Sequence, residues 1–297
     1  AFNKKYFAKY RMERRRTAFE KNLEEINSHN REFEEGKSQF RMGLNKFADL
    51  DNELYKKQMV RMRDTNHRKM DVEINDEIVG AAAKDAPDSL DWRTKGFVTS
   101  PVNQKTCGSC YAFSISYAIT GQIMQRIGRL EYVSQQQLVD CSVETGNQGC
   151  AGGSLRYTLK YLEKCGGIMR QVDYPYTSSA GKCIFNRDLA IANISEWAIM
   201  PKNEDGLAFA VWKVGPIAVS LNAAPKSFQL YKTGIYDDEA SCDNSKVNHA
   251  MLLVGYTPTY WILKNWWGSW GEDGYMKLAR GKNLCGISNY ASYVTIA

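Results

Sequence analysis

The spacing of apolar and polar residues divides the chain into a helical front part and a mixed rear part. Residues 1–70 are highly charged and contain no cysteine. Residues in this part recur at spacings of three or four, which predicts one face of an amphipathic helix: Arg15, Phe19, Asn22, Ile26 and Asn30. An extended segment over 39–44 and a second helix near 51–63 are expected to follow. Residues 64–86 show little periodicity and end in small residues, which is typical of an exposed, cleavable linker.

Beyond residue 86 aromatic residues, glycine and cysteine become more frequent. An apolar run predicts a helix beginning at Cys110. Ser134 and Gln137 have the spacing of a capping box, so a short helix should begin there. The glycine-rich stretch 149–153 predicts a turn into a helix over 154–164, and no Lys-Ser/Thr pair follows it, which disfavours a phosphate-binding loop. Strands are predicted at 217–221, 250–256, 260–264, 275–278 and 293–296.

This order of elements predicts an α+β enzyme with two subdomains. The 297 residues, 43% of them hydrophobic, suffice for one large domain or two smaller ones. Residues 1–86 carry 19 Lys and Arg against 16 Asp and Glu, and the remainder carries 20 against 17. Because this charge is spread evenly, a nucleic-acid partner is not expected. The sequence contains no run of 18 apolar residues, so a membrane span is not expected. No secretory signal is recognised.

The eight cysteines all lie at or beyond Cys107, which favours an oxidising compartment. If one of them is a free nucleophile, the other seven form three bridges and leave one thiol, with a pairing that the sequence does not fix. Asn193-Ile194-Ser195 is a glycosylation sequon and is consistent with secretion.

Cys110 is the candidate nucleophile, because it follows a small-residue turn at the predicted start of a helix. Backbone N–H groups and the positive end of the helix dipole favour a thiolate there, and the thiolate is the nucleophilic form. Cys107 and Cys110 also have the spacing of a redox pair or of half a zinc site. A redox pair would follow a strand, whereas a loop-like stretch precedes Cys107. A Cys₂His₂ zinc site needs two histidines, and residues 87–297 contain one.

A nucleophilic cysteine needs a base, and the chain offers His29, His67 and His249. His29 lies in the charged front helix and His67 in the presumed linker. A lone histidine at a strand end is usually structural. His249, however, is the only histidine left for Cys110 if the front part is removed, so we interpret it as the base.

Asn265 is the candidate residue that orients this base. Its side-chain amide can accept the imidazole N–H, and the tryptophans around it would exclude water from that hydrogen bond. An aromatic turn packed in the core is the alternative reading, and both can hold. Gln104 lies six residues before Cys110. Its side-chain NH₂, with the backbone N–H of Cys110, can bind the oxyanion of a tetrahedral intermediate.

Together these residues resemble the papain family of cysteine proteases in its zymogen form, with the pattern of cathepsin L. Gln104, Cys110, His249 and Asn265 match the family's oxyanion glutamine, nucleophile, base and orienting asparagine, in the family's order. Trp267 matches the tryptophan that shields the asparagine. The resemblance implies a papain-like fold, with a helical part and a β-barrel-like part, and a helical N-terminal propeptide.

The front part resembles the family's inhibitory propeptide, which runs through the active-site cleft backwards relative to substrate. The residues of the predicted helix face match its helix motif. A second motif is matched by Gly43, Asn45, Phe47 and Asp49. Arg11 stands where the helix motif begins with Glu, so that residue's salt bridge is not expected. The first propeptide helix also looks shortened. The implied division is a propeptide over 1–86 and a catalytic domain over 87–297.

The resemblance also implies the disulfides and the substrate site. The bridges would join Cys107 to Cys150, Cys141 to Cys183, and Cys242 to Cys285, each worth about 3–4 kcal/mol in the chain-entropy model. Cys165 would then be the odd thiol, in the role of a small buried hydrophobe. Tyr111 stands where the family usually has Trp, which changes packing but not chemistry.

The implied substrate-binding residues include a pocket for the second residue before the cleaved bond. Its walls would be Ser154, Leu155, Ser220, Val247, Ala250 and Tyr290, with Gly152, Gly153 and Trp267 completing the substrate site. Because none of the walls is acidic, an apolar side chain is favoured there. Tyr290 replaces a smaller residue of cathepsin L and should shorten the pocket, which favours medium aliphatic side chains over Phe.

These observations predict a cysteine endopeptidase that is latent until its propeptide is removed, with acid weakening carboxylate contacts such as those of Asp49. The alternative is a catalytically silent relative that acts as a binding or inhibitor protein. Protein and peptide substrates and the chain's own propeptide are the expected partners, with no metal or cofactor, no nucleic acid and no membrane. A monomer in a lysosomal or secreted location is expected.

Overall fold

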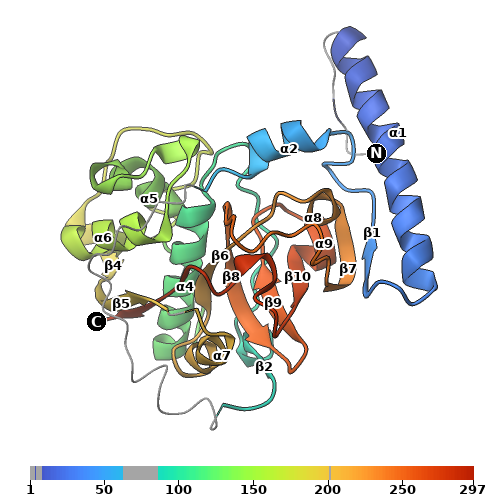
Figure 1. The fold of residues 1–297 in the computed structure, drawn as a ribbon. Helices are drawn as coiled ribbons and strands as arrows, with labels where there is room; N and C mark the ends of the chain where they lie inside the picture. Colours follow the sequence, from blue (N-terminus) through green and yellow to red (C-terminus); the bar gives the residue numbers. More distant parts are fainter. Residues whose placement is uncertain (1–3, 5–8, 63–85, 201) are drawn as a thin grey trace.

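The computed structural model describes residue 4 and residues 9–62, 86–200 and 202–297. It contains a leading segment, a helical subdomain and a sheet subdomain (Figure 1). Three elements form the leading segment: α1 (Lys9–Glu34), β1 (Phe40–Met42) and α2 (Asn52–Met59). The expected α+β architecture with a helical N-terminal segment is confirmed. The predicted linker at 64–86 lies almost wholly outside the described residues, as does most of the stretch 1–8, on which the expectation of a shortened first helix rests.

The helical subdomain contains three α-helices and a small two-stranded sheet: α4 (Cys110–Ile127), α5 (Gln135–Cys141), α6 (Leu155–Cys165), β3 (Ile168–Met169) and β4 (Ala190–Ala192). Short 3-10 turns accompany the two subdomains: η1 (Trp92–Lys95), η2 (Ser142–Thr145), η3 (Gly149–Ala151), η4 (Arg187–Leu189) and η5 (Leu284–Gly286). The helix predicted at Ser134 begins there, because the Ser134 hydroxyl accepts the N–H of Gln137 at 2.9 Å. The capping box is only half formed, since the Gln137 side chain instead bonds Gly167 and Met169.

The second subdomain is built on one mixed sheet, whose strands are β2 (Leu90–Asp91), β5 (Ile194–Ile199), β6 (Ile217–Leu221), β7 (Tyr231–Tyr236), β8 (His249–Tyr256), β9 (Tyr260–Lys264), β10 (Tyr275–Ala279) and β11 (Ala291–Ile296). The neighbours run β1-β7-β10-β9-β8-β6-β11-β5, with β2 on β8. The strand of the leading segment therefore joins the sheet of the second subdomain at its edge. Three helices accompany the sheet: α7 (Glu204–Lys213), α8 (Lys226–Gln229) and α9 (Trp270–Asp273).

The helix α4 joins the two subdomains, and it lies between the other green helices and the sheet in Figure 1. Most of its side chains are buried. Ser114 donates a hydrogen bond of 2.6 Å to the Met251 carbonyl of β8. A Cβ on Gly121 would lie 2.9 Å from Pro216, so only glycine permits this close packing. The N-terminus of α4 is thereby fixed beside the start of β8.

The leading segment crosses from one subdomain toward the other. Phe40 pairs with Gly234 and Met42 with Tyr231 in the antiparallel β1–β7 ladder. On α1 the predicted helix face is the buried one, with Asn22 and Ile26 in the interior. Asn22 donates to two carbonyls of the following segment, at 2.8 and 2.9 Å. In Figure 1, α2 spans the top of the molecule from α1 toward the helical subdomain.

A catalytic site of cysteine-protease type

Cys110 is the first residue of α4, and its side chain is fully buried in this latent form. The backbone N–H groups of Ala250 and Tyr111 contact the sulfur. The contact with Ala250 places the thiol directly beside the start of β8, where His249 is the first residue. Tertiary packing of α4 on β8 thus brings together two residues that are far apart in the sequence.

His249 and Asn265 form the second contact of the site. The His249 Nε2 lies 2.8 Å from the Asn265 Oδ1, and the same oxygen accepts the backbone N–H of Trp266 at 2.8 Å. A backbone N–H only donates, so the atom that it faces is the amide oxygen. The proton of the neutral imidazole therefore lies on Nε2, and Nδ1 carries the lone pair. Within the described residues, this buried Nδ1 has no hydrogen-bond partner.

Trp267 covers the imidazole of His249. Its ring centroid lies 4.6 Å from that of His249. From the leading segment, Phe47 and Tyr55 pack edge-on against Trp267, with centroids at 5.3 and 5.8 Å. All three aromatic side chains are buried. Water is therefore excluded from the His249–Asn265 hydrogen bond, which strengthens it.

Gln104 is held in the loop that precedes α4. Its side-chain Nε2 donates to the Cys107 carbonyl at 2.9 Å, and its backbone N–H donates to Trp266 at 2.9 Å. An amide nitrogen has two hydrogens, so one remains for another acceptor. Tyr176 supports this loop, because its hydroxyl donates to the Gln104 carbonyl at 2.8 Å and lies 2.7 Å from the Ser109 hydroxyl.

Burial favours neutral forms of both reacting groups while the leading segment is in place. It raises the pKa of the Cys110 thiol to about 11, although three backbone N–H groups favour the thiolate. Burial also lowers the pKa of His249 to about 4, against the opposite effect of its hydrogen bond to Asn265. The thiol and the imidazole are therefore both uncharged over most of the pH range in the latent form.

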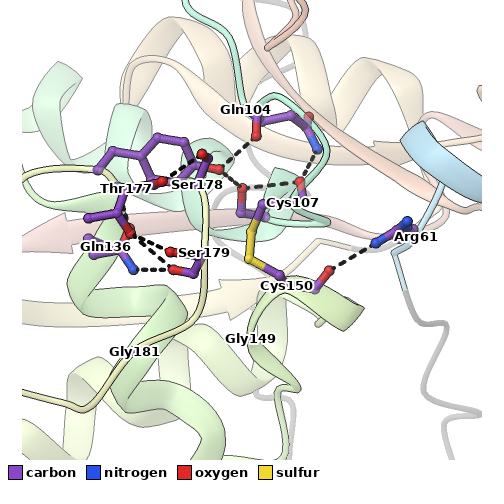
Figure 2. The surroundings of a disulfide bond; sticks show 12 residues. Arg61, Gln104, Cys107, Gln136, Gly149, Cys150, Thr177, Ser178, Ser179 and Gly181 are labelled. Atoms are coloured by element: carbon purple, nitrogen blue, oxygen red, sulfur yellow. Dashed lines mark hydrogen bonds between the residues drawn. A yellow bond between two sulfur atoms is a disulfide. The ribbon is translucent and has the colours of Figure 1, made fainter. Parts of the chain in front are cut away.

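The leading segment passes over the site just before the undescribed residues begin. The Met62 N–H donates to the Asn248 carbonyl at 2.9 Å, next to His249. Figure 2 shows Arg61 reaching the carbonyl of Cys150, at 3.5 Å, beside the disulfide that joins Cys150 to Cys107. The segment thus contacts both sides of the site.

The structure contains three disulfides, and their pairs are those that the resemblance implies: Cys107–Cys150, Cys141–Cys183 and Cys242–Cys285. Cys110 and Cys165 are the free cysteines of the described residues. Cys165 is only partly buried at the end of α6, and burial raises its pKa, so it has the character of an unreactive thiol.

The residues expected to form the pocket come together in part. Ser220 of β6 pairs with Ala250 of β8, and the Ser220 N–H donates to the Tyr290 carbonyl at 3.0 Å. Val247 precedes the same strand, whereas Ser154 and Leu155 begin α6 in the other subdomain. The walls are buried except for Tyr290, which is half-buried.

Two glycines border the same region. Gly152 has a φ of 123°, in the range that favours glycine. A Cβ on Gly153 would lie 2.5 Å from the Asn147 side chain and 2.8 Å from Tyr111. The Tyr111 hydroxyl donates to the Gly149 carbonyl at 2.9 Å, so this tyrosine supports the glycine-rich turn through a polar contact.

Sequence reasoning missed several residues that build the site. Tyr176 gave no signal, because an isolated tyrosine in a loop matches no pattern. Trp266 was expected only to exclude water, yet its backbone N–H fixes the orientation of the Asn265 amide and its ring nitrogen donates to the Ala250 carbonyl at 2.9 Å. Gln229 also went unnoticed, although its side-chain amide bonds Phe47, Leu50 and Asn52 of the leading segment. The described residues hold no cluster of three or more His, Cys, Asp or Glu side chains that could bind a metal ion.

A buried thiol at a helix N-terminus, an imidazole oriented by an amide and a covering strand-and-helix segment define a cysteine protease in its latent form. Residues 86–295 match the profile of the papain family of cysteine proteases, and residues 1–55 match that of the cathepsin propeptide inhibitor domain. The chain belongs to the papain family.

Its relatives include cathepsins. The chain is 40% identical to human cathepsin L2 over 293 residues, which cover 95% of this chain and 86% of that protein. It is 38% identical to mouse procathepsin L, with the same two shares. Among solved structures, digestive procathepsin L2 from the larval midgut of Tenebrio molitor is 33% identical with a TM-score of 0.90, covering 99% of this chain and 96% of that one.

Proposed function

We propose that Cys110, His249, Asn265 and Gln104 are the residues that hydrolyse peptide bonds in this cysteine protease. The observation that carries the proposal is the His249–Asn265 hydrogen bond, which leaves Nδ1 unprotonated next to the residue that contacts the thiol. Once the cover is removed, solvent stabilises charge, and Nδ1 takes the thiol proton to give a thiolate–imidazolium pair.

The thiolate then attacks the carbonyl carbon of the substrate. The resulting oxyanion is bound by the Cys110 N–H and the second hydrogen of the Gln104 side chain. His249 returns the proton to the leaving amine as the C–N bond breaks, which leaves an acyl group on Cys110. A water molecule, deprotonated by the same nitrogen, releases the acid and restores the thiol.

The substrate preference follows from the proposed pocket. None of its walls carries a carboxylate, so a basic side chain at the second position before the cleaved bond has no counter-ion there. Tyr290 reduces the depth of the pocket. We therefore expect medium aliphatic side chains to be preferred, and a peptide library that selected Arg or Phe would contradict this assignment.

The leading segment acts as an intramolecular inhibitor. It covers Trp267, donates to the Asn248 carbonyl beside His249, and reaches the carbonyl of Cys150, which is bonded to Cys107. The proposed boundary between inhibitor and enzyme is 86–87. Three disulfides favour a compartment outside the cytosol, lysosomal or secreted. Among the described residues no helix is long and apolar enough to cross a membrane. We expect a monomer.

Acid incubation followed by N-terminal sequencing and a peptide-substrate assay tests the proposal. We expect shortening of the chain near residue 86 together with the appearance of hydrolysis. The Cys110→Ser variant should do neither, while retaining its disulfides and its thermal unfolding temperature. Shortening and hydrolysis in that variant would show that another residue is the nucleophile.

A further inference from the structure

A cavity of about 450 Å³ lies at the junction of the leading segment and the enzyme. The front segment contributes most of its lining: Lys4, Arg11, Arg15, Lys46, Phe47, Leu50, Gln58 and Met59. The enzyme contributes the loop that carries Gln104, through Asn103, Lys105 and Thr106. The catalytic mechanism uses none of these side chains.

The lining is strongly basic. Five of its residues are Lys or Arg, and the described lining contains no Asp or Glu. Lys4 and Arg15 contact Asp49 at the edge of the cavity, Arg15 at 3.6 Å. For Arg11, Lys46 and Lys105, no carboxylate of the described residues lies within ion-pair distance. Among the described residues, Asp49 is therefore the carboxylate that forms ion pairs with these five cations, and it reaches two of them.

Lys46 shows how this excess of positive charge affects one side chain of the lining. Its Nζ donates to the neutral Asn103 Oδ1 at 3.1 Å, which joins the two parts of the chain without compensating charge. Burial and the nearby Lys4 lower the pKa of Lys46 to about 8. Lys46 is therefore short of a counter-ion, and an anion in the cavity would supply one.

We propose that this cavity binds a compact, multivalent oxyanion, such as a polyphosphate or a multiply sulfated sugar, and that the bound anion holds the leading segment on the enzyme. A volume near 450 Å³ accommodates a molecule of mono- or disaccharide size. Arginine and lysine are the side chains that recognise phosphate and sulfate groups, Arg through paired hydrogen bonds.

The effect on latency follows from where the lining comes from. Only three of the eleven lining residues, with one cation, remain when the leading segment departs. The anion therefore binds the covered form and not the open enzyme, so mass action shifts the equilibrium toward the covered form. At ten times its dissociation constant it would lower the open population, and the rate of self-cleavage, about 11-fold.

Binding is measured first on the Cys110→Ser chain, which does not cleave itself if the proposed function holds. The probes are sodium tripolyphosphate, sucrose octasulfate and sulfate, with NaCl added to equal ionic strength because screening alone weakens surface contacts. Calorimetry should show one binding site per chain for tripolyphosphate or for sucrose octasulfate. The probe that binds more tightly shows whether the site prefers a phosphate or a sulfated ligand. The enzyme without its leading segment should not bind.

The Arg11→Gln/Lys105→Asn variant removes one cation from each side of the cavity. We chose Asn at 105 because Lys105 has a φ of 57°. The matched control, Lys21→Gln/Lys182→Asn, removes two exposed charges outside it. Affinity should fall about tenfold or more in the first variant and remain unchanged in the control. Equal affinity in both variants, no saturable binding, or equal binding to the open enzyme would overturn the site.

The final experiment, which measures self-cleavage, rests on the proposed function. With the wild-type cysteine, the same anion should slow acid self-cleavage in the chain and in the control, and much less in the Arg11→Gln/Lys105→Asn variant. Faster cleavage would overturn the holding role. A chain that binds the anion but never cleaves itself, with or without it, would refute the proposed function and leave the binding site established.

Discussion

Gln229 is a residue of the enzyme whose side chain binds only the leading segment, so replacing it should weaken latency without weakening catalysis. It is fully buried. Its Nε2 donates to the carbonyls of Phe47 and Leu50, each at 3.0 Å, and its Oε1 accepts from Asn52 at 3.1 Å. Gln229→Ala removes all three contacts.

The expected magnitude follows from these contacts. A net hydrogen bond is worth about 1 kcal/mol, and an unsatisfied buried group costs about 1–3 kcal/mol. Each group keeps one other hydrogen bond: the Leu50 carbonyl from Asn22 at 2.9 Å, the Phe47 carbonyl from the Leu50 N–H at 2.9 Å, and the Asn52 amide to the Ala224 carbonyl at 3.0 Å. The three lost bonds therefore count at their net value. We therefore expect docking of the segment to weaken by about 3 kcal/mol, or roughly 150-fold in the ratio of covered to open chain.

Self-cleavage at a fixed mildly acidic pH measures this ratio, as long as opening precedes cleavage. Gln229→Ala should process much faster than the wild type, and its mature enzyme should have the wild-type kcat/KM. The matched control is Gln136→Ala, because Gln136 is also buried and bonds only groups of the enzyme, among them Asp140 and Thr177. That variant should lose stability without faster processing. An unchanged rate for Gln229→Ala, with normal mature activity, would refute the reasoning.

Three further predictions address stability, pH dependence and specificity. Tyr111→Phe removes the shorter of two hydrogen bonds to the Gly149 carbonyl, which keeps only the Gly152 N–H at 3.4 Å. The change should cost about 1 kcal/mol in chemical denaturation, and an unchanged midpoint would show that the contact is not needed. Burial raises the pKa of Glu272, but hydrogen bonds led by the Gly234 N–H lower that pKa overall. The ionised Glu272 therefore stabilises the fold above its unfolded pKa near 4.5, and this stabilisation is lost as the pH falls through the lower folded pKa. The difference in unfolding free energy between the wild type and Glu272→Gln should shrink over that acid range, and a constant difference would contradict this. Tyr290→Ala should deepen the proposed pocket and shift cleavage of a peptide library from medium aliphatic residues toward Phe, and an unchanged profile would remove Tyr290 from its walls.

Local patterns predicted the elements whose residues pack within one short stretch. The strands β6 and β9 have the expected limits, since each is a continuous apolar run between turn residues. The strand β7 was not predicted, because Lys232, Thr233 and Gly234 interrupt its apolar character. Its partner β1 lies almost two hundred residues earlier, and a pairing over that distance leaves no local trace in the sequence.

In the candidate site, too, the sequence predicted some residues and missed those whose contacts form only in the folded chain. Cys110 and His249 could be selected because the reaction requires a nucleophile and a base, and few residues qualify. The supporting contacts of Tyr176 and Gln229 depend on side chains that meet only in the folded chain. Asp49 was expected to hold the leading segment through carboxylate contacts, and its ion pairs to Lys4 and Arg15 lie within that segment.

The central claim is that Cys110 becomes a nucleophile beside His249 only when the leading segment is removed. Labelling with a thiol-directed epoxide, followed by mass spectrometry before and after acid incubation, tests it most directly. The account predicts no label on the intact chain and, after incubation, one label on Cys110 with complete loss of peptide hydrolysis. Rapid labelling of the intact chain, a label on Cys165 alone, or full activity in the labelled enzyme would contradict it.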